Sequence, residues 1–159
     1  MCGYAWTTGW DGATVVPACD MTVGSCFEAA GAELCATGTI PASADPAYPG
    51  MMIGWNAQQD DMGGANATWT ASGAGLTATF TATGATGQTR IVIQSGATDY
   101  CANATSGMAI PWSGFTVGCW EVGGAAFSAG MPVTALGIQV NSTDAAQSVD
   151  LCVTGVTVN

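Results

Sequence analysis

Amide side chains and the only basic residue lie on one alternating face of three strand-like segments. The segments are MMIGWNAQQ (51–59), TRIVIQSG (89–96) and LGIQVNS (136–142). The polar positions are Asn56, Gln58, Arg90, Gln94, Gln139 and Asn141. Amides both donate and accept hydrogen bonds, and a guanidinium donates several, so such a set can bind adjacent hydroxyl groups. The pattern favours an uncharged, polyhydroxylated ligand, although each position alone is also typical of a solvent-facing strand residue.

Six Trp and three Tyr residues supply aromatic rings, on which the apolar faces of sugar rings can stack. Trp55 alternates with apolar residues and Trp112 follows a proline at a predicted strand start, so both are expected in the interior. Trp120, beside a glycine-rich loop, and Tyr100 are the better candidates for an exposed ligand surface.

The charged residues exclude most other functions. The sequence has eleven acids, one base and no His, and its net charge is −10. Nucleic acid and anionic membrane surfaces repel such a chain. Without His or Lys, nucleophile–imidazole pairs, Schiff bases and P-loops are ruled out.

Carboxylates leave two narrower possibilities, catalysis and metal binding. A glycosidase needs two positioned acids, and we interpret Asp60, Asp61, Asp99 and Glu121 as an acidic surface instead. Asp60, Asp61 and Asp150 could contact calcium, but no D-x-[DN]-x-[DN]-G loop is present. We therefore expect no enzyme, and we assign no metal ligand.

Seven cysteines indicate disulfides rather than zinc binding, because no pair has C-x2-C spacing and no His can complete a mixed site. Disulfides place the domain in an oxidising, extracellular setting. We predict the local pairs Cys19–Cys26 and Cys101–Cys119, with Cys2 left over.

Two similar phrases, LCATGTI (34–40) and LCVTGVTV (151–158), stand far apart in the sequence. Cys follows Leu in both, so strand alternation turns the leucines toward one face and Cys35 and Cys152 toward the other. If the two strands are neighbours, these cysteines can form a disulfide. The alternative is that each strand pairs elsewhere.

Period-two alternation predicts strands along most of the chain. GLTATFTATG (75–84) places Leu76, Ala78 and Phe80 on one face, as the three segments above do with their own apolar residues. Turn residues separate these runs, and we expect GATDYCANATSG (96–107) to be such a connection. We predict an all-β, antiparallel β-sandwich with disulfide staples. One domain covers residues 1–159, with N-terminal strands and a disulfide-pinned loop over 1–33 and the sandwich body over 34–159.

The order of seven short phrases points to a family. They are MMIGWNAQQ, GLTATF, TRIVIQ, YCA, IPWSGF, CWE and ALGIQV…VDLCVTGVTV. In this order the chain resembles, over residues 34–158, the jelly-roll carbohydrate-binding modules of secreted bacterial polysaccharide-degrading proteins, in the galactose-binding-like group. The resemblance implies two antiparallel sheets, a concave face that takes a glycan, and often a structural calcium ion. Thr154 and Gly155 stand where such modules often carry a pair of acids.

Two functions follow as expectations. The first is a secreted, non-catalytic carbohydrate-binding module for a neutral polysaccharide or oligosaccharide, working alone or beside other domains of a larger protein. The second is a structural or adhesive cell-surface subunit that self-associates, for which exposed strand edges and a free Cys2 would provide contacts.

Overall fold

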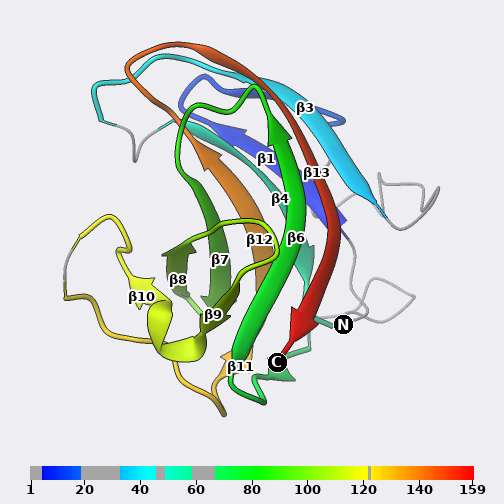
Figure 1. The fold of residues 1–159 in the computed structure, drawn as a ribbon, viewed down its shortest axis with the longest axis vertical. Helices are drawn as coiled ribbons and strands as arrows, with labels where there is room; N and C mark the ends of the chain where they lie inside the picture. Colours follow the sequence, from blue (N-terminus) through cyan, green and yellow to red (C-terminus); the bar gives the residue numbers. More distant parts are fainter. Residues whose placement is uncertain (1–4, 19–32, 46–48, 59–66, 122) are drawn as a thin grey trace.

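The computed structural model describes residues 5–18, 33–45, 49–58, 67–121 and 123–159. Within these ranges every regular element is a β-strand except one short 3-10 helix, η1 (Trp112–Gly114). The described part of the chain has no helix long and apolar enough to cross a membrane. The predicted fold class, an all-β antiparallel sandwich with disulfides, is confirmed (Figure 1).

The larger sheet has six antiparallel strands in the order β1-β4-β12-β7-β8-β10. Its strands are β1 (Ala5–Trp10), β4 (Gly50–Asn56), β12 (Ala135–Asn141), β7 (Thr89–Ser95), β8 (Thr98–Asn103) and β10 (Thr116–Val117). The three segments with alternating amides and Arg are therefore the adjacent strands β4, β12 and β7. Side chains that are far apart in the sequence become neighbours on this sheet.

The second sheet has five strands in the order β2-β3-β13-β6-β9. They are β2 (Thr14–Val16), β3 (Leu34–Ile40), β13 (Gln147–Val158), β6 (Gly75–Thr83) and β9 (Ala109–Pro111). A small two-stranded sheet pairs β5 (Trp69–Thr70) with β11 (Pro132–Val133). Figure 1 shows β3, β13 and β6 side by side in one layer.

The core lies between the two large sheets and is built from the apolar half of each alternating strand. Ile53, Ile91 and Ile138 come from the six-stranded sheet, and Leu76 and Leu151 from the five-stranded one, all at most 2% exposed. Trp55 and Trp112 are buried in this core, as their sequence context predicts. Alternation requires the polar positions of the same strands to face outward.

Both predicted disulfides that fall on described residues are formed. Cys35 on β3 lies directly opposite Cys152 on β13, with 4.0 Å between their Cα atoms. The first of the two similar phrases is thus β3 and the second lies within β13, paired as expected. Cys101 is bonded to Cys119. The predicted Cys19–Cys26 pair and Cys2 lie outside the described residues.

One predicted connection contains a strand. Residues 96–107 were expected to be a loop, but β8 occupies Thr98–Asn103 after a two-residue turn in which Gly96 has a φ of 61°. Glycine at a positive φ is what a tight hairpin turn requires. Asp99 and Asn103, within the strand itself, are also residue types common in turns. Their turn preference hid the alternation of the strand.

Candidate ligand-binding site

The outward face of the six-stranded sheet gathers most of the predicted polar residues. Gln139 on β12 lies opposite Arg90 on β7, and Arg90 lies opposite Asn103 on β8. On the far side of β12, Gln139 lies opposite Met52. These four residues form one row across the sheet, because directly paired residues of neighbouring strands point to the same face.

Arg90 is almost completely buried within this row, with 7% of its surface exposed. Its Nε donates a hydrogen bond to Asn103 Oδ1 at 3.2 Å. With the Asn141 amide oriented so that its oxygen faces Arg90, that oxygen accepts from Nη1 at 2.7 Å and from Nε at 3.1 Å. The other side of the Asn141 amide contacts the amide of Gln139. Amides from the two strands that flank β7, namely β8 and β12, thus surround one guanidinium.

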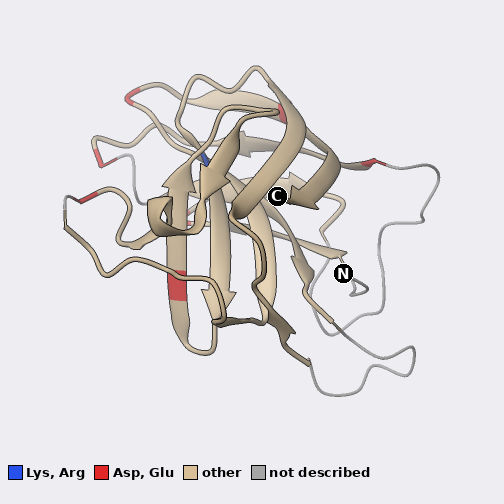
Figure 2. Cartoon of the chain, turned by 60° about the horizontal axis from the view of Figure 1, so that its bottom comes forward, with Lys and Arg blue, Asp and Glu red and all other residues tan. Residues whose placement is uncertain are grey.

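No carboxylate in the described part of the chain forms an ion pair with Arg90. Every acidic residue described is exposed, and most lie outside strands. Figure 2 shows the one basic residue in blue and the acids in red, mainly on connecting loops. Burial lowers the pKa of the Arg90 guanidinium by desolvation, although an arginine side chain stays charged at neutral pH.

Trp120 covers Arg90 from the solvent side. The guanidinium carbon lies 5.9 Å from the centroid of the indole, within the range of a cation–π contact. The Cys101–Cys119 disulfide ties residues 118–121 to β8. These residues form a tight turn, in which Glu121 N donates to Gly118 O at 2.7 Å. Trp120 nevertheless stays 59% exposed, so its outer surface remains open to a ligand.

A small depression of about 60 Å³ lies on the same face, beside the Arg90 row. It is lined by Trp6, Met52, Val92, Gln94, Asp99, Ala135, Leu136 and Gly137. The ring of Trp6 lies against Gly54, since a Cβ added there would come within 2.4 Å of the indole. The Trp6 Nε1–H is buried and finds no hydrogen-bond partner among the residues that the structure describes. The depression therefore has an aromatic wall, a largely apolar floor and polar groups at its rim.

Adding a methyl group at Gly54 is expected to displace Trp6. Gly54→Ala should lower the free energy of unfolding by about 1–3 kcal/mol, because the new Cβ overlaps a ring packed on the sheet. Urea denaturation, with tryptophan fluorescence as the readout, measures this loss.

Gly155→Ala is the matched control for Gly54→Ala. A Cβ at Gly155 meets no atom within 4 Å. Its free energy of unfolding should change by less than about 0.5 kcal/mol. Equal losses in the two variants would contradict the placement of Trp6 against Gly54.

The structure brings together part of the predicted ligand set. Arg90, Gln139 and Trp120 lie in contact or in direct register. Asn141 contacts Arg90 and Gln139 but is 0% exposed, so it holds Arg90 in place and, contrary to expectation, offers no surface to a ligand. Gln94 is exposed on the same face at the rim of the depression, four residues and roughly 13 Å along β7 from Arg90.

Three other predicted residues lie elsewhere. Asn56 is on β4 but only 2% exposed, so it offers little surface to a ligand. Gln58 is exposed beyond the end of β4, roughly 20 Å along the chain from the level of Gln139. The expectation that Tyr100 is exposed is wrong. It is 9% exposed and packs edge-on against Phe127 at 5.3 Å, because β8 turns Tyr100 and Ala102 inward.

Sequence reasoning missed Asn103, Trp6 and the glycines beneath the face. Asn103 was assigned to a connection, although the alternation of Tyr100 and Ala102 with polar neighbours signals the strand. The sequence leaves open whether Trp6 is buried or exposed, because its position on Gly54 depends on the pairing of β1 with β4. Such cross-strand contacts are nonlocal and leave no local pattern.

The outward face of the five-stranded sheet is chemically different. It carries a shallow groove of about 490 Å³ whose surface is mostly apolar; half of its lining residues are Thr or Ser, and no aromatic residue is among the lining residues described. Some of these hydroxyls already pair with one another, as Thr14 Oγ1 and Thr39 Oγ1 do at 2.8 Å. The described residues that line this groove include neither an aromatic ring nor a cation, so it is the weaker candidate.

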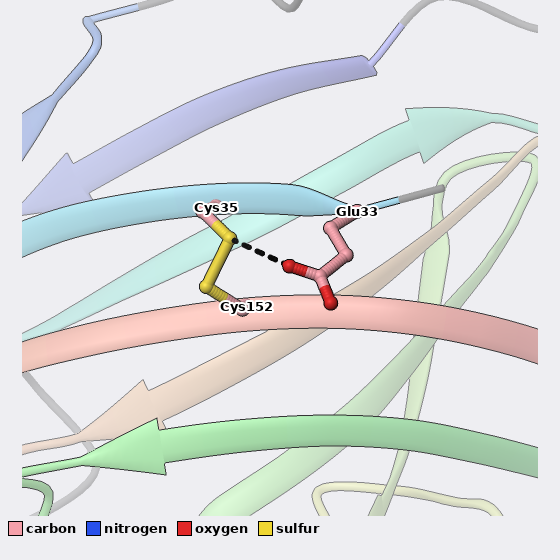
Figure 3. Close-up of side chains that lie close together, drawn as sticks. All are labelled: Glu33, Cys35 and Cys152. Carbon is pink, nitrogen blue, oxygen red and sulfur yellow. Dashed lines mark hydrogen bonds between the residues drawn. A yellow bond between two sulfur atoms is a disulfide. The ribbon is translucent and has the colours of Figure 1, made fainter. Parts of the chain in front are cut away.

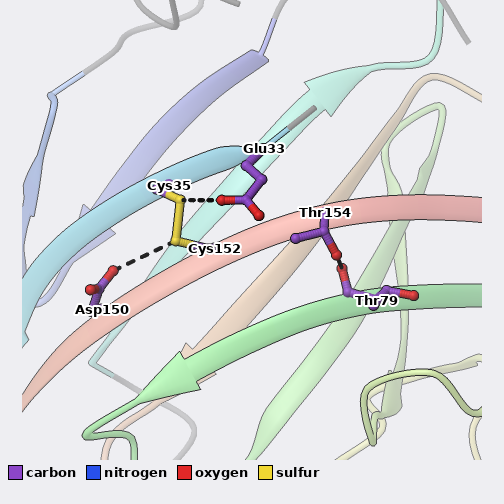
Figure 4. Close-up of a disulfide and its surroundings, with 6 residues drawn as sticks. All are labelled: Glu33, Cys35, Thr79, Asp150, Cys152 and Thr154. Carbon is purple, nitrogen blue, oxygen red and sulfur yellow. Dashed lines mark hydrogen bonds between the residues drawn. A yellow bond between two sulfur atoms is a disulfide. The ribbon is translucent and has the colours of Figure 1, made fainter. Parts of the chain in front are cut away.

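The disulfide on that face has two carboxylates beside it. Figure 3 shows Glu33 pointing toward the bridge, with its Oε2 4.0 Å from Cys35 Sγ. Figure 4 adds Asp150, whose Oδ1 lies 3.8 Å from Cys152 Sγ. Bonded sulfurs carry no proton and offer no thiolate, so Glu33, Cys35 and Cys152 do not constitute a metal site in this state.

No protein-family model matches this chain, and no curated protein matches its sequence. Its class is therefore defined by the fold, a disulfide-bridged antiparallel β-sandwich. The two disulfides indicate an oxidising environment.

Proposed function

We propose that this domain is a secreted, non-catalytic carbohydrate-binding module that binds its glycan on the outward face of the six-stranded sheet. The observation that carries the proposal is the convergence of Gln139 and Trp120 on Arg90, which the buried Asn141 holds in place, beside a depression walled by Trp6 and rimmed by Gln94. Hydrogen-bonding amides next to exposed aromatic and apolar surface suit the hydroxyl groups and the C–H faces of a sugar. The neutral hydroxyls of the glycan are the groups that these amides would bind.

Two features support a binding rather than a catalytic role. Among the described residues that line the depression, Asp99 is the only carboxylic acid, whereas glycoside hydrolysis generally needs two. The sequence also lacks His and Lys, which removes most alternative general bases and nucleophiles. Of the acids considered for calcium, Asp60 and Asp61 lie outside the described residues, and Asp150 lies beside the disulfide on the other sheet. We propose no metal requirement.

Retention on polysaccharides tests the proposal. The purified domain, with its disulfides intact, is incubated with a panel of insoluble polysaccharides and run through native gels containing soluble ones. Binding to at least one member, reversed by its soluble oligosaccharide, is expected. Failure to be retained by any member, with millimolar oligosaccharides also giving no signal in calorimetry, would overturn the proposal.

Truncating Trp120 is expected to weaken glycan binding about tenfold, because one stacking surface is lost. The free energy of unfolding of Trp120→Ala should stay within about 0.5 kcal/mol of the parent, since the side chain is 59% exposed. Titration calorimetry with the retained oligosaccharide gives the affinity, and Trp120→Phe is the control that keeps a ring. An affinity unchanged in Trp120→Ala would remove this residue from the site.

Self-association has less support in the fold. Of the four strands at the edges of the two large sheets, β2 and β9 have three residues and β10 has two, whereas β1 has six. Three of the four edges are therefore short. Edges this short provide few free backbone groups for pairing with another chain. Light scattering after size-exclusion chromatography distinguishes the two functions, with a monomer expected here.

A further inference from the structure

Arg90 is a buried cation with no counter-charge in the described part of the chain. It is 7% exposed, and no carboxylate pairs with it. Removing a charge from water is unfavourable unless partners compensate for the lost hydration. Asn103 and Asn141 offer only dipoles, and the indole of Trp120 only its π face. The described residues therefore supply no charged partner to this site.

The guanidinium still has hydrogen-bonding capacity. It carries five N–H groups in one plane. Asn103 and Asn141 take up Nε and one N–H of Nη1. Nη2 has no acceptor among the described residues. The remaining N–H groups can therefore serve an acceptor that enters beside Trp120.

The charge of the chain limits which acceptor fits. Arg90 is the only base, and Glu121 stands next to Trp120 in a protein with a net charge of −10. A single guanidinium balances one negative charge and matches the planar fork of a carboxylate. A phosphate with nearly two charges would be incompletely balanced. Repulsion from more distant acids such as Asp99 is largely screened at physiological salt, where the Debye length is about 8 Å.

Resting on the proposed function, we infer that the glycan bound by this domain carries uronic acid units, and that Arg90 binds the carboxylate of one such unit at the edge of the Trp120 indole, whose outer surface stacks on an adjacent unit. Gln139 and Gln94 then lie on the same face for hydroxyl groups of that unit or of neutral neighbours along the chain. The proposed ligand is therefore an acidic polysaccharide, in which hydroxyl groups bind the amides and a carboxylate binds Arg90.

Matched pairs of ligands test the inference on the unmodified protein. One pair is a methyl-esterified tetragalacturonate that keeps a single free carboxylate and its fully methyl-esterified form. The other is a xylo-oligosaccharide with and without a glucuronate branch. In titration calorimetry at pH 7, the acidic member of at least one pair is expected to bind about 10 to 100 times more tightly than its neutral counterpart.

Variants at Arg90 identify the residue responsible. Arg90→Gln should remove the preference for the acidic member, while Arg90→Lys should keep part of it, because Lys retains the charge but loses the planar fork. Thermal unfolding of each variant checks that it is folded. If Arg90→Gln does not fold, the comparison of acidic and neutral ligands on the unmodified protein still tests the inference.

The outcomes separate the two proposals. Equal affinity for acidic and neutral members, or a preference that survives Arg90→Gln, overturns the assignment of the carboxylate while carbohydrate binding stands. Absence of binding to both pairs and to the whole polysaccharide panel overturns the proposed function together with this inference.

Discussion

Replacing Cys35 and Cys152 together by serine is expected to lower the free energy of unfolding by about 5 kcal/mol. The disulfide joins residues 117 positions apart. In the chain-entropy model such a closed loop strongly restricts the unfolded chain, and the stabilisation grows with the logarithm of loop length. The bridge also joins β3 to β13, the central strand of the five-stranded sheet. Since small proteins are stable by about 5–15 kcal/mol in total, the variant should be close to unfolding at 37 °C.

Urea denaturation under non-reducing conditions measures this change. The matched control is the double variant Cys101→Ser and Cys119→Ser, whose disulfide spans only 18 positions. The chain-entropy model predicts a smaller loss of about 3 kcal/mol for it. If the control lost as much free energy of unfolding as the Cys35 and Cys152 variant, or more, the longer disulfide would not be the more stabilising one and the prediction would be wrong.

Trp112→Ala is expected to lower the free energy of unfolding by about 3–5 kcal/mol. Trp112 is 3% exposed, and its ring centroid lies 5.6 Å from that of Phe127 and 6.1 Å from that of Phe115. Its Nε1 donates to the backbone oxygens of Ser72 and Gly73, each at 3.1 Å. Truncation therefore leaves a cavity and also removes a donor from two carbonyl groups.

Two further substitutions separate these contributions. Trp112→Phe keeps an aromatic ring but loses the donor, so it should be destabilised less than Trp112→Ala. Trp120→Ala removes an indole that is 59% exposed and should be nearly neutral for stability. If Trp112→Ala and Trp120→Ala gave the same midpoint in urea, the burial of Trp112 would be contradicted.

The two tryptophans illustrate how stability and binding are divided in this fold. Trp112 packs among Trp69, Phe115 and Phe127 at one end of the sandwich. Trp120 is held outside the core by a disulfide and a turn. Substitutions at the first should therefore affect unfolding, and substitutions at the second should affect ligand affinity.

Much of the fold could be predicted because alternation is a local property. Ile91 and Ile93 face the core, while Arg90 and Gln94 lie on the other face of the same strand, as their spacing indicates. The strand β8 was missed because Gly96, Asp99 and Asn103 favour turns, and their local preference competed with the alternation of Tyr100 and Ala102. That single error accounts for both the wrong exposure of Tyr100 and the omission of Asn103.

The sequence by itself determined which face of each strand is apolar, the shortage of cations, and the possibility that Cys35 meets Cys152. These depend on residue type and on a period of two along one strand. Only the tertiary structure decided that Gln139, Arg90 and Asn103 share one row, that Trp6 lies on Gly54, and that Arg90 is buried beneath Trp120. Register and coverage arise from backbone pairing between segments distant in sequence, and alternation within a strand carries no information about which strand lies beside it or which loop covers it.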